Sequence, residues 1–221
     1  DGKSYGIIDL DSQLYMWVGP GSGVDNYSPA TLYHSADGAA TWQPATWTLN
    51  EQPPLILPTF LQFGQGYAGA RDDYVYAYAP RLSDSTTLGI QTMGEIFLMR
   101  TPKNEMMSEA AKEYFVGRNS LNIAIWTNDQ ATANPVFQDA NGVGWATSAC
   151  YNPNSQRYLL VTEHGTSMDS KWGVFDAPEP WGPWTVVHYE DSFGPSSWEQ
   201  SLFYWNFPTK FLNGNNFDIF V

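Results

Sequence analysis

The chain has 221 residues, of which 43% are hydrophobic and 16% aromatic, and 23 acidic against 10 basic residues give a formal net charge of −13. This length allows one large domain with a buried core. So acidic a protein repels phosphate groups, which excludes nucleic acids and anionic membrane surfaces as expected partners. No apolar run approaches the length of a membrane span. The single cysteine, Cys150, cannot form an internal disulfide, no Cys/His spacing indicates a metal site, and we expect neither metal nor cofactor.

Repeated turn-and-strand units are the strongest pattern in the chain. At four places a polar turn is followed by a strand in which apolar residues alternate, a pattern typical of the second strand of a β-hairpin. The four turns are Asp11-Ser12, Asp72-Asp73, Asn154-Ser155 and Gly214-Asn215. A further strand and a turn follow three of these units, over residues 31–42, 94–106 and 172–184.

This repeat predicts an all-β fold, a β-propeller of four-stranded antiparallel blades, with a β-sandwich as the alternative. We expect one domain over residues 1–221, a short helical turn within residues 108–115, and a long connection over residues 119–142. Because the chain ends inside a fourth unit, we expect it to be a portion of a five- to seven-bladed ring. The predicted blades are 4–50, 58–118, 143–190 and 198–221.

One of the turns carries a motif. Residues 35–42, SADGAATW, resemble the Asp-box of sialidase-type propellers: Ser35, Asp37, Thr41 and Trp42 match, and Ala39 stands at the usual glycine position. The resemblance implies a structural role, in which Asp37 accepts backbone N–H groups of the turn and Trp42 is buried between blades.

A broader resemblance covers most of the chain from Tyr67 to Leu212. Residues 176–187, DAPEPWGPWTVV, resemble a blade turn of arabinanase-like glycoside hydrolases. The runs GYAGARDDYVYAYAP, EIFLMRTPKNEMM, RYLLVTEHG and FPTKFL are similar to secreted propellers of a little-characterised domain family. The resemblance implies a secreted or extracytoplasmic protein that handles a polysaccharide or oligosaccharide, since some relatives degrade arabinan or cleave uronic-acid polysaccharides. It specifies the fold better than the substrate, because propellers host many chemistries.

The candidate site consists of residues next to the strands expected to line the channel. Asp72 lies beside Arg71 in a segment rich in small residues, where a carboxylate and a cation could act on a ligand. Glu163 and His164 follow a buried strand, and such a pair can transfer protons near neutral pH. The alternative is structural: Asp72 forms a turn, and Glu163 is a solvated strand end.

Three functions remain open. A glycoside hydrolase needs two carboxylates, for which Asp72 and Glu163 are the predicted pair and Asp9 the reserve, and His164 completes the predicted catalytic set. A uronate-polysaccharide lyase needs cations and a residue that moves a proton, which Arg71, Lys210, Tyr67 and His164 would supply. A non-catalytic propeller would bind sugar through aromatic rings. The predicted substrate-binding residues are Tyr67, Arg71, Trp145, Arg157 and Lys210.

Overall fold

The computed structural model describes residues 2–20, 29–83, 89–165, 171–191, 205–212 and 214. These residues form strands and loops with five short 3-10 turns, which confirms the predicted all-β class. The turns are Gln65–Tyr67, Lys103–Glu105, Glu109–Ala111, Gln130–Thr132 and Thr209–Phe211. Within the described part of the chain, no helix is long and apolar enough to cross a membrane.

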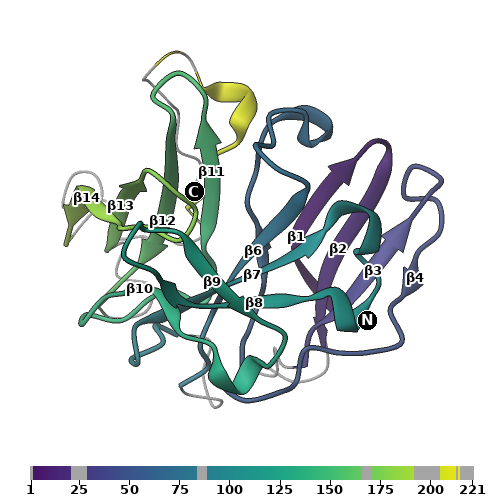
Figure 1. Ribbon diagram of the computed structural model, residues 1–221, viewed down its shortest axis with the longest axis horizontal. Coiled ribbons are helices and arrows are strands. Elements are labelled where there is room, and N and C mark those ends of the chain that lie inside the picture. Colours follow the sequence, from purple (N-terminus) through teal and green to yellow (C-terminus); the bar gives the residue numbers. More distant parts are fainter. Residues whose placement is uncertain are drawn as a thin grey trace, which may run out of the picture.

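The first and third sheets are four-stranded antiparallel sheets, in which each strand pairs with the next along the chain (Figure 1). The first contains β1 (Gly2–Leu10), β2 (Gln13–Pro20), β3 (Thr31–Ser35) and β4 (Gln43–Pro44). The third contains β11 (Ser148–Asn152), β12 (Arg157–Glu163), β13 (Trp172–Ala177) and β14 (Thr185–Glu190). The predicted strand after Gly214-Asn215 lies outside the described residues.

The second sheet has six strands because two strands share its fourth position and one further strand pairs outside them. It contains β5 (Thr59–Phe60), β6 (Tyr74–Pro80), β7 (Glu95–Pro102), β8 (Glu113–Arg118), β9 (Ala124–Thr127) and β10 (Pro135–Gln138). β8 pairs with Met99 and Arg100 on β7, and β10 pairs with the other end of β7. The segment 119–142, predicted as a long connection between blades, instead contains the strands β9 and β10 of this sheet. The helical turn predicted within 108–115 is limited to 109–111, because Tyr114 and Phe115 are buried in β8 instead.

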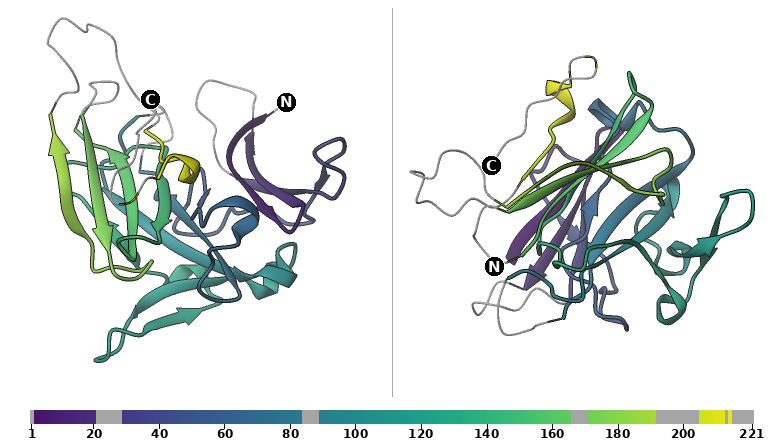
Figure 2. Two further views of the ribbon diagram at one scale, coloured as in Figure 1. Left: turned by 90° about the horizontal axis from the view of Figure 1, so that it is seen from above. Right: turned by 90° about the vertical axis from the view of Figure 1, so that its left-hand side faces the viewer.

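The three sheets fan out around a common centre rather than stacking as two layers, and their first strands lie side by side (Figure 2). Gln62, just after β5, donates its backbone N–H to Ala149 on β11 at 3.0 Å and its side-chain amide to Ile7 on β1 at 3.2 Å. Gly6 allows β1 to approach this closely, since a Cβ there would lie 2.7 Å from the carbonyl oxygen of Pro58. The centre of the molecule is thus formed by three converging strands.

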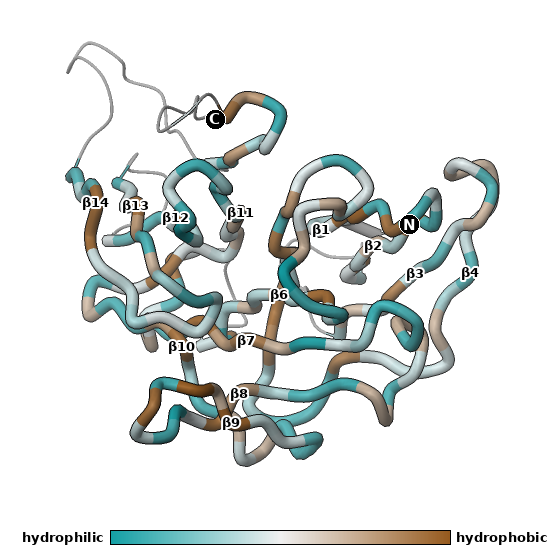
Figure 3. Tube along the Cα trace, turned by 45° about the horizontal axis from the view of Figure 1, so that its top comes forward, coloured by the Kyte–Doolittle hydropathy of each residue, from teal (hydrophilic) through white to brown (hydrophobic). Residues whose placement is uncertain are grey.

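The second strands carry the core. Every residue from Val75 to Pro80 on β6 and from Tyr158 to Glu163 on β12 is buried. The β8–β9 hairpin projects away from this core and carries the exposed residues Leu121, Ile123 and Ile125, seen as a hydrophobic run in Figure 3.

Asp37 holds the turn between β3 and β4 as predicted. Its carboxylate accepts the backbone N–H of Thr41 at 2.9 Å, the Thr41 hydroxyl at 2.6 Å and the Ser35 hydroxyl at 2.9 Å. These donors lower the pKa of Asp37 to about 2. Trp42 was predicted to be buried, but it is only half-buried. It directly precedes β4, a two-residue strand at the edge of the sheet, where little of the chain can cover it.

We predict that Ala39→Gly stabilises the protein. Ala39 has a φ of 73°, in the left-handed region that costs a residue with a Cβ about 1 kcal/mol. The substitution should therefore raise the free energy of unfolding by about 1 kcal/mol in urea denaturation. Gly38→Ala is the matched control, since Gly38 has a φ of 69° and no atom near its Cβ position, and it should lose a similar amount. An unchanged stability in both variants would contradict the prediction.

Lys112 packs against the loop that follows the first sheet. Its ammonium lies 3.7 Å from the centroid of the Trp47 ring, and the Trp47 indole N–H donates to the carbonyl of Met107 at 2.8 Å. Burial lowers the pKa of Lys112 from 10.5 to about 8, and the nearby Glu109 and Glu51 oppose this shift. The folded state therefore favours a neutral Lys112 more than the unfolded state does.

This shift predicts that the free energy of unfolding depends on pH. Between about pH 8 and 10.5 the unfolded chain binds more protons at Lys112, so stability rises with pH across this window. Relative to Lys112→Met, which does not titrate, the wild type should gain roughly 2 kcal/mol between pH 7 and pH 9.5. Urea denaturation of both proteins at both pH values measures this, and the tyrosines titrate alike in the two proteins. A difference that stays constant with pH would contradict the assignment.

Candidate functional site

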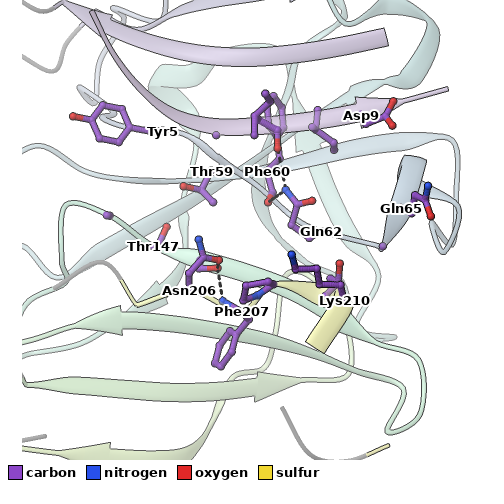
Figure 4. Close-up of a pocket in the computed structure, with 18 of the residues that line it drawn as sticks. Tyr5, Asp9, Thr59, Phe60, Gln62, Gln65, Thr147, Asn206, Phe207 and Lys210 are labelled. Carbon is purple, nitrogen blue, oxygen red and sulfur yellow. Dashed lines mark hydrogen bonds between the residues drawn. The ribbon is translucent and has the colours of Figure 1, made fainter. Parts of the chain in front are cut away.

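A cavity of about 890 Å³ lies where the first strands of the three sheets converge, a volume in the range of ligand pockets. We call it the central pocket. Its walls come from residues 5–9 on β1, residues 59–66 around β5, residues 146–148 at β11, and residues 205–210 (Figure 4). Four segments far apart in the sequence thus meet at one site.

Two charged side chains face the central pocket from different walls. Asp9 comes from β1, and Lys210 comes from the 3-10 turn Thr209–Phe211 across the pocket (Figure 4). Oδ1 of Asp9 accepts the backbone N–H of Ser12 at 2.8 Å, which fixes the carboxylate beside the β1–β2 turn. Among the described residues no group bonds Oδ2, so this oxygen is available to a ligand.

Amides and hydroxyls supply the other polar groups of the pocket. The Ser148 hydroxyl donates to Asn206 Oδ1 at 2.9 Å and accepts the backbone N–H of Phe207 at 3.3 Å, which holds segment 205–207 beside β11. The Thr147 hydroxyl is buried and has no hydrogen-bond partner in the part of the chain that the structure describes. A buried polar group in this state calls for an explanation, and a ligand in the pocket would provide one.

The central pocket receives few of the residues predicted from sequence. Of the eight predicted site residues, Lys210 alone lines it, and Asp9, the reserve carboxylate, does so as well. The predicted platform Trp145 is buried in the wall behind the pocket, where its ring meets Tyr5 edge-on at 5.6 Å. Trp145 therefore packs rather than offering a face to a sugar.

Tyr67, Arg71 and Asp72 lie together at the start of β6, outside the central pocket. The Asp72 carboxylate accepts the backbone N–H of Tyr74 at 2.9 Å and the Tyr76 hydroxyl at 2.7 Å. Burial raises the pKa of Tyr67 well above its usual range, so this hydroxyl stays protonated. These contacts show Asp72 in the structural role given above as the alternative, capping the entry to β6.

Arg71 and Arg157 contact neighbouring side chains of the third sheet. Arg71 donates to the Tyr158 hydroxyl at 3.5 Å. Arg157 donates to Asp176 at 2.7 Å and holds the pKa of that carboxyl below its usual range. Neither guanidinium lines the central pocket.

Glu163 and His164 lie at the far end of β12 and are buried. The backbone carbonyl of Glu163 accepts the N–H of Gly144 at 2.9 Å. The His164 ring stacks on Tyr189 with centroids 3.9 Å apart, and its Nε2 lies 3.3 Å from the carbonyl oxygen of Trp172. The expectation of a solvated strand end is therefore wrong for both residues.

The structure does not bring the predicted carboxylate pair together. The side chain of Arg71, next to Asp72, reaches Tyr158 at the start of β12, whereas Glu163 lies at the other end of β12, five residues or about 16 Å further along the strand. Glycosidase carboxylates are about 5 to 9.5 Å apart. His164 follows Glu163 at that far end of β12, so it does not meet Arg71 and Tyr67 as the lyase prediction requires. The predicted pairing is wrong because β6 and β12 begin at the same end of the molecule. Asp72 lies just before the start of β6, whereas Glu163 is the last residue of β12, so the two lie at opposite ends of these strands.

The uncharged residues of the pocket could not be recognised from sequence patterns. Gln62, Thr147, Ser148 and Asn206 carry no charge and stand in no motif. Gln62 follows the very short strand β5, which alternation did not reveal. The one usable signal was position, since each lies on or beside a segment preceding one of the predicted hairpin strands.

We predict that Asp72→Ala destabilises the protein through Tyr76. The substitution removes the acceptor of a hydroxyl on a residue that is only 2% exposed, which costs about 1–3 kcal/mol. Tyr76→Phe removes the hydroxyl that donates this bond. In a protein that already carries Tyr76→Phe, Asp72→Ala should therefore lower the free energy of unfolding by about 1 kcal/mol less than it does in the wild type. Urea denaturation of the four proteins of the cycle measures the coupling. Equal costs in both backgrounds would show that the bond contributes nothing.

Among solved structures, one similar protein has the same fold over almost the whole of this chain. It comes from Bacteroides ovatus ATCC 8483 and is described provisionally as a hydrolase; the TM-score is 0.56 and the sequence identity 12%. The match covers 99% of this chain and 53% of that protein, so this chain spans about half the length of the solved protein. At this identity the likeness shows the fold alone.

Two glycoside hydrolases are less similar. An exo-β-1,3-galactanase from Phanerochaete chrysosporium has a TM-score of 0.38 and 14% identity over 84% of this chain and 49% of its own. The family 43 glycoside hydrolase YxiA from Bacillus licheniformis has a TM-score of 0.48 and a sequence identity of 12%. The match covers 80% of this chain and 37% of YxiA. Both scores are too low to carry an argument about this chain. No curated protein has a significantly similar sequence.

Membership of a family follows from the sequence itself. The profile of a family described as a domain of unknown function, DUF4185, matches residues 8–202, which is most of the chain. The chain therefore belongs to the DUF4185 family.

Proposed function

We propose that the protein cleaves a glycosidic linkage in a polysaccharide and that the central pocket binds the sugar. One observation carries the proposal: a cavity of about 890 Å³ is lined by a carboxylate, an ammonium group, amides and hydroxyls from four segments. A hydroxyl-rich ligand needs many such donors and acceptors and little charge.

In this proposal Asp9 is a catalytic carboxylate. Its Oδ1 is held by Ser12, which fixes the side chain while Oδ2 remains available to the substrate. Lys210 would bind a substrate hydroxyl or carboxylate as a point charge. Hydrolysis with two carboxylates requires a second one, which no described residue of the pocket wall supplies. The proposal therefore requires this group from outside the described residues.

That requirement supports a second candidate, a pocket that binds sugar without cleaving it. The described wall already suffices for such binding, because amides and hydroxyls can pair with sugar hydroxyls without a second carboxylate. Elimination from a uronate chain has less support, because Tyr67, Arg71 and His164 do not line the central pocket with Lys210.

The proposal extends to the whole fold. We take the three sheets as blades of a five- to seven-bladed propeller, supported by their converging first strands, and the Asp37 turn as an Asp-box. We further propose an extracytoplasmic location, which rests on the resemblance to secreted propellers.

We predict that Asp9→Asn abolishes cleavage. The amide keeps an oxygen for the Ser12 N–H, so the turn should persist, while loss of acid–base function should lower kcat about a hundredfold or more. New reducing ends released from arabinan and from polygalacturonate by the full-length protein measure the activity. Ultraviolet absorbance detects the unsaturated products of a lyase.

Asp73→Asn is the matched control, since Asp73 is exposed and lies outside both cavities. It should cleave as the wild type does. Cleavage by Asp9→Asn at the wild-type rate would contradict the catalytic assignment. Binding of a polysaccharide by the wild type without any product would favour the second candidate.

A further inference from the structure

A second cavity, of about 510 Å³, lies beside the central pocket; we call it the side cleft. Its walls come from the β1–β2 hairpin, from the loop around residues 66–70, and from residues 103–104 after β7. The two cavities share Gly66 in the 3-10 turn Gln65–Tyr67. A single ligand could therefore occupy both by crossing this turn.

The side cleft is polar and close to neutral. Asp11 supplies one carboxylate and Lys103 one ammonium group, while Gln13 and Asn104 supply amides and Tyr15 a hydroxyl. Within the described part of the chain, the amide nitrogen of Gln13, the side chain of Asn104 and the Tyr15 hydroxyl have no hydrogen-bond partner. These groups are available to a ligand with many hydroxyls, whereas the balanced charges give no preference for an anion or a cation.

Several of these side chains are already held in place. Nζ of Lys103 donates to the carbonyl of Asp72 at 2.6 Å and lies 5.7 Å from the centroid of the Tyr67 ring. Oε1 of Gln13 bonds His34 at 2.8 Å, and the His34 ring stacks on Tyr15 with centroids 4.8 Å apart. Groups fixed before binding lose less entropy when a ligand arrives.

Tyr15 has the properties of a sugar contact. Its ring forms part of the wall, with His34 packed on it, and its hydroxyl, protonated at neutral pH like that of any tyrosine, can donate a hydrogen bond. An aromatic ring with a polar end suits a sugar, which has apolar C–H faces and hydroxyl edges.

We propose that the side cleft is a second carbohydrate site, which binds neutral sugars of the same polysaccharide chain whose neighbouring units occupy the central pocket. The inference rests on the proposed function of that pocket. It assigns Gln13, Tyr15 and Asn104 to substrate binding and residues 65–67 to the ridge that the chain crosses.

The test compares a short and a long ligand by isothermal titration calorimetry of the full-length protein. The probes are linear arabinan fragments of two and six sugars, and a galacturonate fragment of six. The wild type should bind the arabinan hexamer about tenfold or more tightly than the dimer, since only the hexamer reaches both cavities.

Asn104→Trp fills the side cleft from an exposed position, and Asn50→Trp, on an exposed loop outside both cavities, is the matched control. Asn104→Trp should remove the hexamer's advantage and leave dimer binding unchanged; Asn50→Trp should change neither. Gln13→Ala, which adds no bulk, should weaken the hexamer selectively.

The outcomes separate the two proposals. Equal hexamer binding by the wild type, Asn104→Trp and Gln13→Ala would overturn the side cleft while leaving the central pocket intact. Tighter, Asn104-dependent binding of the galacturonate hexamer would overturn the choice of neutral sugars. Failure of the wild type to bind any of the probes would contradict both proposals.

Discussion

The arrangement of the three sheets depends on Gln62. This residue belongs to the second sheet, its backbone bonds to Ala149 of the third, and its side chain bonds to Ile7 of the first. A shorter or apolar side chain would remove this donor from the Ile7 carbonyl, and the loss of such an exposed hydrogen bond costs about 0.5–1.5 kcal/mol or less. This three-way junction ties the first strands of the sheets together at the central pocket, above the buried cluster that the three sheets share.

The central pocket and the junction share a residue, which couples binding to stability. Gln62 lines the cavity whose walls it holds together, and Ser148 does the same for segment 205–207 through Asn206 and Phe207. Substitutions at these positions would change the shape of the pocket as well as its chemistry. Asp9 and Lys210 are different, because neither joins one sheet to another. They are therefore the positions at which chemistry can be tested with the least effect on the fold.

The sequence predicted the second and third strands of each sheet well, because β2, β6 and β12 alternate and follow strong turn residues. It failed for β9 and β10, since a divided fourth strand has no local signal and depends on pairing with β7. The Asp37 turn was predictable because the capping bonds are local. The candidate site was not: Glu163 stands at a strand end, and the segment around Gly144, about twenty residues earlier in the sequence, packs against it there. Gln62 and Asn206 carried no charge that could have drawn attention to them.

The divided outer position of the second sheet bears on how molecules of this protein meet one another. Aggregation through strands requires a long, straight row of free backbone donors and acceptors. β7 has no such row on its outer side, because β8 and β10 take its two ends and each pairing contains or adjoins a register shift. β4 has two residues, and the ladder of β14 is interrupted at Val174/Phe175. At the outer edges of these described strands a second molecule would find short or kinked ladders, so we expect ordered fibril growth through β4, β7 and β14 to be slow.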